Sequence, residues 1–385
     1  MTTFIQSIKD LFAQKEPIPA GMYAYQTPPE AEDHYRLHLR IEKDGSGILV
    51  INAATVLHLN QTAVEYAYHL IKGTDEETIV SEMAKRYRVD KEQIHQDFQD
   101  LQDKILTIID TPDLDPVTYL DIERQEPYSG DLSAPYRLDC ALTYRVNQES
   151  HREDAPVERV DRELTTEEWV AIIHKANNVG IPHLLFTGGE PTLREDLPVL
   201  LEKAETLGLV TGLLTDGLKL EDDSYRQTLL VNGLDHMMMV FDPNKDRLWS
   251  ILETILAEDL FTTVHLTLHQ GEDLRPTIKR LAGMGANALS LSAVDESLNK
   301  EIQALRDFAA VQQIELVWDM PVPYSSNNPV SLELERDEEQ EAPQGAGKAW
   351  LYIEPDGDVL PAQGMYEHIL GNMLTDPWEE IWSKG

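Results

Sequence analysis

The sequence predicts an α/β protein whose main domain is a parallel sheet, open or curled into a partial barrel. Three observations support this prediction. Strand-like and helix-like segments alternate with short connections between residues 137 and 318, which is typical of parallel sheets. A hairpin pattern and three amphipathic segments precede this region, which predicts a small winged-helix-like domain. A second hairpin pattern and a short tryptophan-rich helix come after it.

Composition limits the classes of function. A chain of 385 residues suggests two or three domains, and its formal net charge of −37 disfavours nucleic acid and anionic membranes as partners. This charge fits either general solubility or salt adaptation, or attraction of a basic peptide. Neither a spanning apolar run nor a signal peptide is visible, so we expect a cytoplasmic protein.

The first third of the chain predicts an arm, a small domain and a linker. Residues 1–30 include a proline-rich passage and suggest an arm. In residues 31–110, alternation from Tyr35 to Ile51 indicates a β-hairpin, and three helices are expected to begin near Asn60, Thr74 and Asp90. Prolines and a glycine in residues 111–135 indicate a linker.

Residues 136–323 carry the alternating pattern of the main domain. Its first helix opens with the capping-box sequence Thr165–Glu168 and is expected to end at Gly180. Another helix is expected over Leu193–Leu207. The expected strands are 137–143, 182–187, 209–215, 234–241, 262–268, 288–293 and 314–318.

The loop after the second of these strands reads Thr187-Gly188-Gly189-Glu190. Two glycines allow positive φ angles and close backbone approach, and an acid beside them suggests a ligand amine. In a parallel sheet the carboxyl ends of the strands meet ligands, so this loop is the first candidate site.

The last part of the chain predicts an acidic loop and a small tail. Residues 324–347 are polar and acidic. Residues 348–385 contain a hairpin with a turn at Pro355–Gly357 and a last helix starting at Asp376 with Pro377 in its first position.

Residues 35–110 resemble the PqqD-like domain, and the motifs that carry the resemblance lie between Val56 and Leu106. The likeness rests on the Leu-Asn-Gln-Thr-Ala entry to the first helix, the Gly-Thr-Asp turn and the last amphipathic helix. The resemblance implies that the domain captures a leader peptide as an extra strand on a sheet edge, and Tyr35–Ile51 is the edge we expect. A winged-helix DNA binder is the alternative, which the acidic residues of the last helix oppose.

Residues 135–320 resemble the radical S-adenosylmethionine enzymes, which implies a partial (β/α)6 barrel. The likeness rests on Leu142–Arg145, on Phe186–Leu193 and on Thr215-Asp216-Gly217. It implies that the cofactor's methionine amino group would lie at Gly188, Gly189 and Glu190, supported by Thr215, Asp216 and Gly217. S-adenosylmethionine is therefore a possible cofactor.

The defining CxxxCxxC loop of that family is missing. Its three cysteine positions fall on Val146, Ser150 and Glu153, which do not replace thiolates on an iron–sulfur cluster. Residues 349–383 resemble a SPASM or twitch extension, in which the cysteine position after the turn falls on Ala362. The one cysteine of the chain, Cys140, is expected in the strand core. A [4Fe–4S] cluster is therefore not expected.

Other candidate residues are weaker. His151, Glu153 and Asp154 form a possible metal site or, more simply, a solvated loop, while Met237–Met239 reads as strand core. His265 and His269 do not form a helical pair because their segment is β-like. Asp242 and Asp295 come after strands, where they are either ligand contacts or helix caps.

These observations favour a cluster-free pseudo-enzyme that binds a precursor or leader peptide and acts as an accessory or docking protein, with a true maturase as a further candidate partner. Two enzyme alternatives stay open. One is an active radical-SAM/SPASM peptide maturase, which would need cysteines from another chain. The other is an enzyme that uses S-adenosylmethionine without a cluster. A scaffold that binds neither peptide nor cofactor is a third hypothesis.

Overall fold

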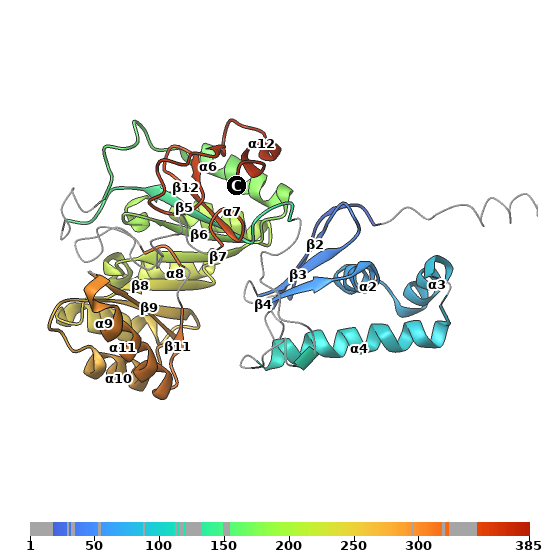
Figure 1. Cartoon of the computed structure of the whole chain (residues 1–385), viewed down its shortest axis with the longest axis horizontal. Helices are drawn as coiled ribbons and strands as arrows, with labels where there is room; N and C mark the ends of the chain where they lie inside the picture. Colours follow the sequence, from blue (N-terminus) through green and yellow to red (C-terminus); the bar gives the residue numbers. More distant parts are fainter. Residues whose placement is uncertain are drawn as a thin grey trace, which may run out of the picture. The chain divides into compact units, whose positions relative to one another are not determined.

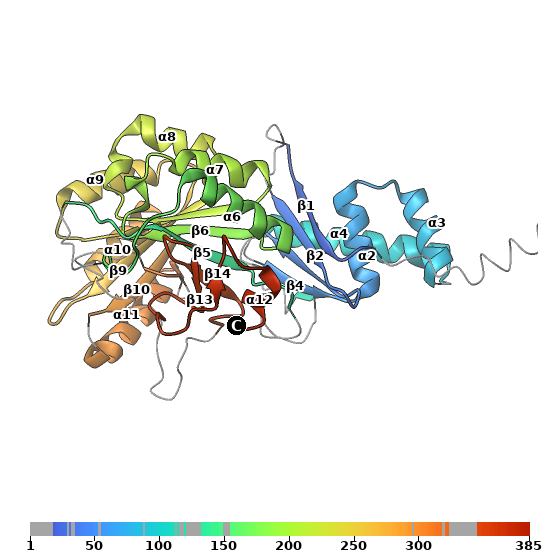
Figure 2. The same cartoon turned by 90° about the horizontal axis from the view of Figure 1, so that it is seen from above.

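The computed structural model describes residues 18–28, 31, 35–52, 55–87, 89–111, 114, 119–120, 132–148, 155–294, 296–317, 320–322 and 345–385. The chain divides into two compact units, Met1–Ser133 and Ala134–Gly385 (Figures 1 and 2). The predicted α/β fold class is confirmed. Most of the predicted acidic loop, residues 324–344, lies outside the described residues.

The first unit contains a four-stranded antiparallel sheet in the order β1-β2-β3-β4. Its strands are β1 (Gly21–Gln26), β2 (Arg36–Ile41), β3 (Gly47–Ile51) and β4 (Thr55–Leu59). The hairpin predicted over 35–51 is confirmed as β2 and β3. Strand β1 lies in the segment expected to be an arm, because Tyr23 and Tyr25 alternate toward the core of this unit and supply its strand periodicity.

Three helices come after the sheet: α2 (Gln61–Lys72), α3 (Glu76–Tyr87) and α4 (Lys91–Asp110). Asn60 and Asp90 cap α2 and α4 as predicted, since each side chain accepts a backbone N–H of the first turn. The cap of α3 is Asp75 rather than Thr74, because the Asp75 carboxylate accepts the Thr78 N–H. Residues of α2 and of the end of α4 close the core over the sheet.

The second unit is built on a ten-stranded sheet with the order β11-β10-β9-β8-β7-β6-β5-β12-β13-β14. The strands β5 to β11 pair in parallel, and each predicted strand of this region is confirmed. Their bounds are β5 (Arg137–Thr143), β6 (His183–Gly188), β7 (Val210–Thr215), β8 (His236–Val240), β9 (Phe261–Leu268), β10 (Ala288–Ala293) and β11 (Glu315–Leu316).

An α-helix comes after each strand from β5 to β10, which gives a partial (β/α)6 barrel (Figure 2). The capping box of α6 is confirmed, but the helix expected from Leu193 begins at Leu197, since Pro191–Leu193 is a short 3-10 turn. The helices are α6 (Thr166–Val179), α7 (Leu197–Thr206), α8 (Asp223–Val231), α9 (Asp246–Ile255), α10 (Arg275–Met284) and α11 (Asn299–Val311).

The C-terminal hairpin extends the main sheet. Strand β12 (Trp350–Ile353) pairs in parallel with β5, and β13 (Asp358–Leu360) and β14 (Gly371–Asn372) lie beyond it in the sheet. The last helix, α12 (Trp378–Trp382), starts later than predicted. The carboxylate of Asp376 accepts the Asn372 N–H instead of capping the helix.

The two faces of the barrel sheet differ. The outer face packs against the helices in one large apolar core that includes Leu138, Cys140 and Leu142 of β5. Side chains of the inner face come from the alternate positions of the same strands. No helix in the described part of the chain is long and apolar enough to cross a membrane.

Candidate functional site

The Gly-Gly-Glu loop packs tightly against the chain that leaves β5. The N–H groups of Gly189 and Glu190 donate to the carbonyls of Thr143 and Arg145 at 2.8 and 2.7 Å. A Cβ atom on Gly188, whose φ is +131°, would lie 2.1 Å from the Thr143 oxygen. Both glycines are therefore required by close backbone approach, as the sequence predicted.

The carboxylate of Glu190 is buried and accepts four hydrogen bonds from its own chain. Its Oε1 accepts from the Thr192 N–H at 3.0 Å, the Thr192 hydroxyl at 2.5 Å and the Thr215 hydroxyl at 2.7 Å. Its Oε2 accepts from the Asp216 N–H at 2.8 Å. Three of these donors share Oε1 and one reaches Oε2, although each carboxylate oxygen offers about two lone-pair positions. In this structure Glu190 therefore joins the loops after β6 and β7.

The loop after β7 brings a second acid to the same place. One Asp216 oxygen accepts the Leu218 N–H at 2.9 Å, and the other accepts the side-chain amide of Asn147. Burial and the Asp216 charge raise the pKa of Glu190 to about 8. Gly217, with φ +77°, makes this turn possible beside Met239.

All six predicted cofactor-binding residues thus lie at the carboxyl ends of β6 and β7 or in the loops after them, and Glu190 joins the two places. The arrangement could hold an amine by exchanging a threonine hydroxyl for a ligand N–H, because hydroxyls can rotate. The buried hydroxyl of Thr187 has no hydrogen-bond partner among the described residues. A cationic ligand would favour the ionised form of Glu190.

Val146, at the first of the degenerate cluster positions, is the one of the three in that loop that the structure describes. Val146 is half-buried against an apolar cluster that includes Tyr144, Ala155 and Tyr352. A valine in such contacts offers no ligand to iron. Ser150, Glu153, His151 and Asp154 lie outside the described residues, as does Asp295.

Cys140 is in no position to bind a cluster. It is 1 % exposed in β5, on the outer face among apolar side chains, and its thiol donates to the Leu138 carbonyl at 3.8 Å. Burial raises the pKa of this thiol well above its usual value. The predicted core role of Cys140 is confirmed, and the residues present do not fit a [4Fe–4S] cluster.

Ala362, at the second degenerate cluster position, is completely buried beyond β13. Nearby, the Glu354 carboxylate accepts both prongs of Arg159 at 2.6 and 2.7 Å and the Tyr144 hydroxyl at 3.0 Å. This contact joins the loop after β5 to the C-terminal hairpin. Hydrogen bonds of the Glu354 carboxylate therefore connect the two regions in which the resemblance places clusters.

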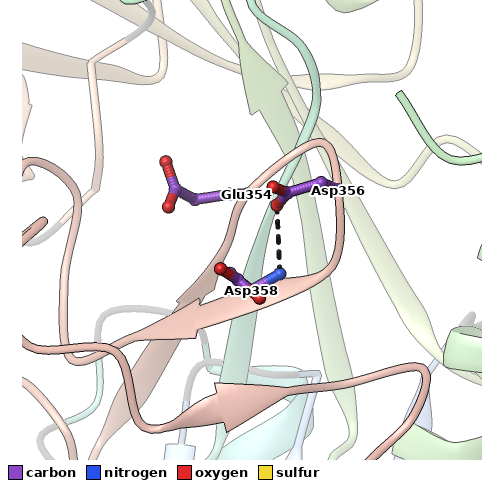
Figure 3. A group of neighbouring side chains, drawn as sticks. All are labelled: Glu354, Asp356 and Asp358. Carbon is purple, nitrogen blue, oxygen red and sulfur yellow. Dashed lines mark hydrogen bonds between the residues drawn. The ribbon is translucent and has the colours of Figure 1, made fainter. Parts of the chain in front are cut away.

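Three carboxylates gather around the turn of that hairpin: Glu354, Asp356 and Asp358 (Figure 3). Each already serves the protein. Glu354 binds Arg159, Asp356 accepts the Asp358 N–H at 3.2 Å, and Asp358 accepts the Asn372 amide at 2.9 Å. The hydrogen bonds and the ion pair of the hairpin turn therefore explain why these three carboxylates lie together.

Other predicted residues have structural roles. His265 lies in β9, where its ring contacts the hydroxyls of Ser290 and Ser292 at 2.9 and 3.0 Å, and burial lowers its pKa to about 3. Met237–Met239 are fully buried strand core, as predicted. Asp242 accepts the Asn244 N–H in a turn after β8.

Sequence reasoning missed a half-buried histidine pair at the start of the barrel strands. The Nε2 atoms of His183 and His236 are 2.8 Å apart, although Gly212 lies between their strands. A Cβ on Gly212 would lie 2.3 Å from the His236 ring, so the glycine makes this contact possible.

The peptide edge expected at Tyr35–Ile51 is not free. Strand β2 pairs with β1 on one side and β3 on the other, and β3 pairs with β4. The expectation was wrong because the strand at Gly21–Gln26 had been included in the arm. Among the described residues of this unit, the sheet ends at β1 and β4.

Sequence comparison relates the chain to a known superfamily. The model of the radical SAM superfamily matches residues 140–303. A PqqA peptide cyclase of Streptomyces rochei is 28% identical over 283 residues, which are 65% of this chain and 76% of the relative. A PqqA peptide cyclase of Granulibacter bethesdensis is 34% identical over 112 residues, 29% of this chain and 30% of the relative.

Solved structures show the same architecture. Streptococcus suis SuiB bound to S-adenosylmethionine has a TM-score of 0.58 at 16% identity, covering 91% of this chain and 87% of SuiB. SuiB bound to its precursor peptide SuiA has a TM-score of 0.57 at 13% identity, covering 89% and 86%. At these identities the likeness establishes the fold alone.

Proposed function

We propose, starting from the relation of this chain to the radical SAM superfamily and to PqqA peptide cyclases, that it is a cluster-free pseudo-enzyme that binds a peptide. It would hold a precursor or partner peptide on its N-terminal unit and dock it for a true maturase. The observation that carries the proposal is the chemistry at the cluster positions. Val146 packs in an apolar cluster, Ala362 is buried, and the single thiol, Cys140, lies in the outer core.

The two outer strands of the first sheet supply the peptide edge. The Thr27 N–H donates to the Tyr35 carbonyl at 3.1 Å, in register with the β1–β2 ladder. Bonding alternates along an antiparallel strand, so the backbone of Ala24 points away from β2. A peptide could therefore add to β1 at this position.

The same reasoning applies to β4. The Asn52 N–H donates to the Arg36 carbonyl at 3.0 Å, so in β3 the backbone of Val50 faces β2. Val56, which is opposite Val50, therefore turns its N–H and carbonyl outward. Strand β4 is the second edge on which an extended peptide could be captured.

A proline substitution tests each edge strand. It removes a backbone N–H that points outward and leaves the hydrogen bonds to the neighbouring strand in place. The full chain would be titrated with short peptides encoded beside its gene. Ala24→Pro blocks β1 and Val56→Pro blocks β4. We expect one substitution to weaken binding at least about tenfold, the equivalent of about 1.4 kcal/mol. Binding that neither substitution changes would refute the edge mechanism.

S-adenosylmethionine binding without a cluster is the second candidate function. It is favoured by the intact Gly-Gly-Glu loop and by the Thr187 hydroxyl, for which the described part of the chain supplies no hydrogen-bond partner. Calorimetry with S-adenosylmethionine tests it, using Glu190→Gln as the variant that loses the carboxylate. A third candidate is an active radical-SAM peptide maturase, as the name of the PqqA peptide cyclases suggests. Such an enzyme would additionally need thiolates from another chain to hold its cluster.

A further inference from the structure

Two histidine side chains meet at the amino ends of the barrel strands. His183 is the first residue of β6 and His236 is the first residue of β8, and both are half-buried. Their Nε2 atoms are 2.8 Å apart and their ring centroids are 4.9 Å apart, so the two rings face each other through these nitrogens. The Gly-Gly-Glu loop comes after the other end of β6, so the pair is separate from that site.

A glycine in the strand between them leaves room for the two rings. Strand β7 lies between β6 and β8, and its Gly212 is the register partner of Leu185 on one side and of His236 on the other. A Cβ atom on Gly212 would lie 2.3 Å from the side chains of both partners. The sequence therefore keeps open, across a whole strand, the space in which the two imidazoles meet.

The separation of the two nitrogens suits a shared metal ion as well as a hydrogen bond. With zinc–nitrogen bonds of about 2.0–2.1 Å as the measure, two bound nitrogens lie about 2.9 Å apart at a right angle and about 3.3 Å apart in a tetrahedron. The observed 2.8 Å is closer to the right angle. Square-planar and tetragonal sites have this angle, and they are typical of Cu²⁺ and Ni²⁺.

The charged groups beside the pair do not oppose a cation. Arg137 is the register partner of His183 in β5, but its guanidinium is paired with the Asp139 carboxylate at 2.7 and 3.2 Å. The charges of these two residues therefore cancel. Asp235, the residue before His236, accepts the Thr211 N–H at 2.8 Å and adds a negative charge near the same strand ends.

We propose that His183 and His236 form a two-histidine site for a borderline divalent transition-metal ion, Cu²⁺ or Ni²⁺, with water completing the coordination. Imidazole is a suitable ligand for both ions. Each ring binds through an Nε2 lone pair, so the ring that donates its Nε2–H within the pair moves that proton to Nδ1. The bound ion would join β6 to β8 across β7. This site is independent of the proposed peptide-binding function.

The competing explanation is a structural hydrogen bond between the two rings. The two explanations differ in what a glutamine can replace. A glutamine amide can donate to an imidazole nitrogen or accept from it, but it is a poor ligand for these ions. A structural pair therefore tolerates His183→Gln, whereas a metal site loses its ion.

The test is equilibrium dialysis of the untagged full chain against Cu²⁺ near pH 7.5, where imidazoles are ordinarily neutral. We expect the tightest site to hold about one ion per chain, and His183→Gln and His236→Gln each to weaken that site at least about tenfold. His95→Gln is the matched control, because the His95 side chain is 46 % exposed and lies in the other unit. It should leave the tightest site unchanged.

Electron paramagnetic resonance of the wild type with one equivalent of Cu²⁺ gives a second readout that needs no variant. Nitrogen couplings from two imidazoles are expected, and fewer than two would overturn the inference even if the glutamine variants do not fold. Circular dichroism shows whether they fold. A folded His183→Gln that binds Cu²⁺ as the wild type does, or a His95→Gln that loses the ion equally, would also overturn it.

Discussion

Arg159 and Glu354 form a two-pronged ion pair that joins the loop after β5 to the C-terminal hairpin. The distances are 2.6 and 2.7 Å, and the Arg159 guanidinium also lies 4.3 Å from the centre of the Tyr366 ring. The Glu354 side chain is 1 % exposed. Removing Arg159 would leave the buried Glu354 charge with too few hydrogen bonds.

Arg159→Met should lower the free energy of unfolding by about 3 kcal/mol, because the Tyr144 hydroxyl is the one remaining donor to the Glu354 carboxylate among the residues that the structure describes. Chemical denaturation monitored by circular dichroism measures the loss. Arg162→Met is the matched control, since the pair of Arg162 with Glu168 lies at the surface, and it should change the free energy of unfolding far less than Arg159→Met does. Equal effects of the two substitutions would contradict the assigned role.

Gly188→Ala should destabilise the second unit by at least about 3 kcal/mol. The new Cβ would lie 2.1 Å from the Thr143 oxygen at a φ of +131°, so the backbone would have to move. Gly283→Ala, in helix α10 with open space around it, should instead stabilise the protein by about 0.5 kcal/mol. Thermal unfolding of both variants measures the difference. An unchanged midpoint for Gly188→Ala would mean that the loop is not held closely against β5.

Glu190 should make stability fall as pH rises. Its pKa is about 8 in the folded protein against an ordinary value of 4.5, so the folded state binds the proton more tightly. The resulting stabilisation is complete below pH 4.5 and disappears as pH approaches 8. Replacing the titrating carboxyl by an amide in Glu190→Gln should flatten this dependence.

The measurement is the denaturation midpoint of wild type and Glu190→Gln at intervals from pH 5 to pH 8. Glu168→Gln is the control, because Arg162 lowers the pKa of Glu168 to about 2 and this acid does not titrate in the range. Identical pH slopes for wild type and Glu190→Gln would show that Glu190 is not the group responsible.

The fold was predictable wherever local patterns agree with tertiary packing. The apolar strands of the barrel and the capping box at Thr165 have signals that depend on a few neighbouring residues. Strand β1 was missed because Tyr23 and Tyr25 lie in a proline-rich passage, and the partner that makes them a strand is distant in sequence. The pairing of β12 with β5 is equally non-local.

The residues of the candidate site were predictable from the sequence, but the hydrogen bonds between them were not. The sequence identified Glu190 and Thr215, whereas only the structure shows that the Thr215 hydroxyl donates a hydrogen bond to the Glu190 carboxylate. No sequence motif could indicate the contact of Gln363 with Val322 or the pairing of His183 with His236. Such contacts depend on where the chain returns to the same sheet.

The central claim is that this chain, with its radical-SAM-type fold, holds no cluster, and anaerobic reconstitution of the full chain with iron and sulfide tests it most directly. After gel filtration, we predict no bound sulfide and no iron beyond the amount retained by the Cys140→Ala variant. About four irons and four sulfides per chain, lost in Cys140→Ala or in a variant of the Ser150 region, would contradict the account.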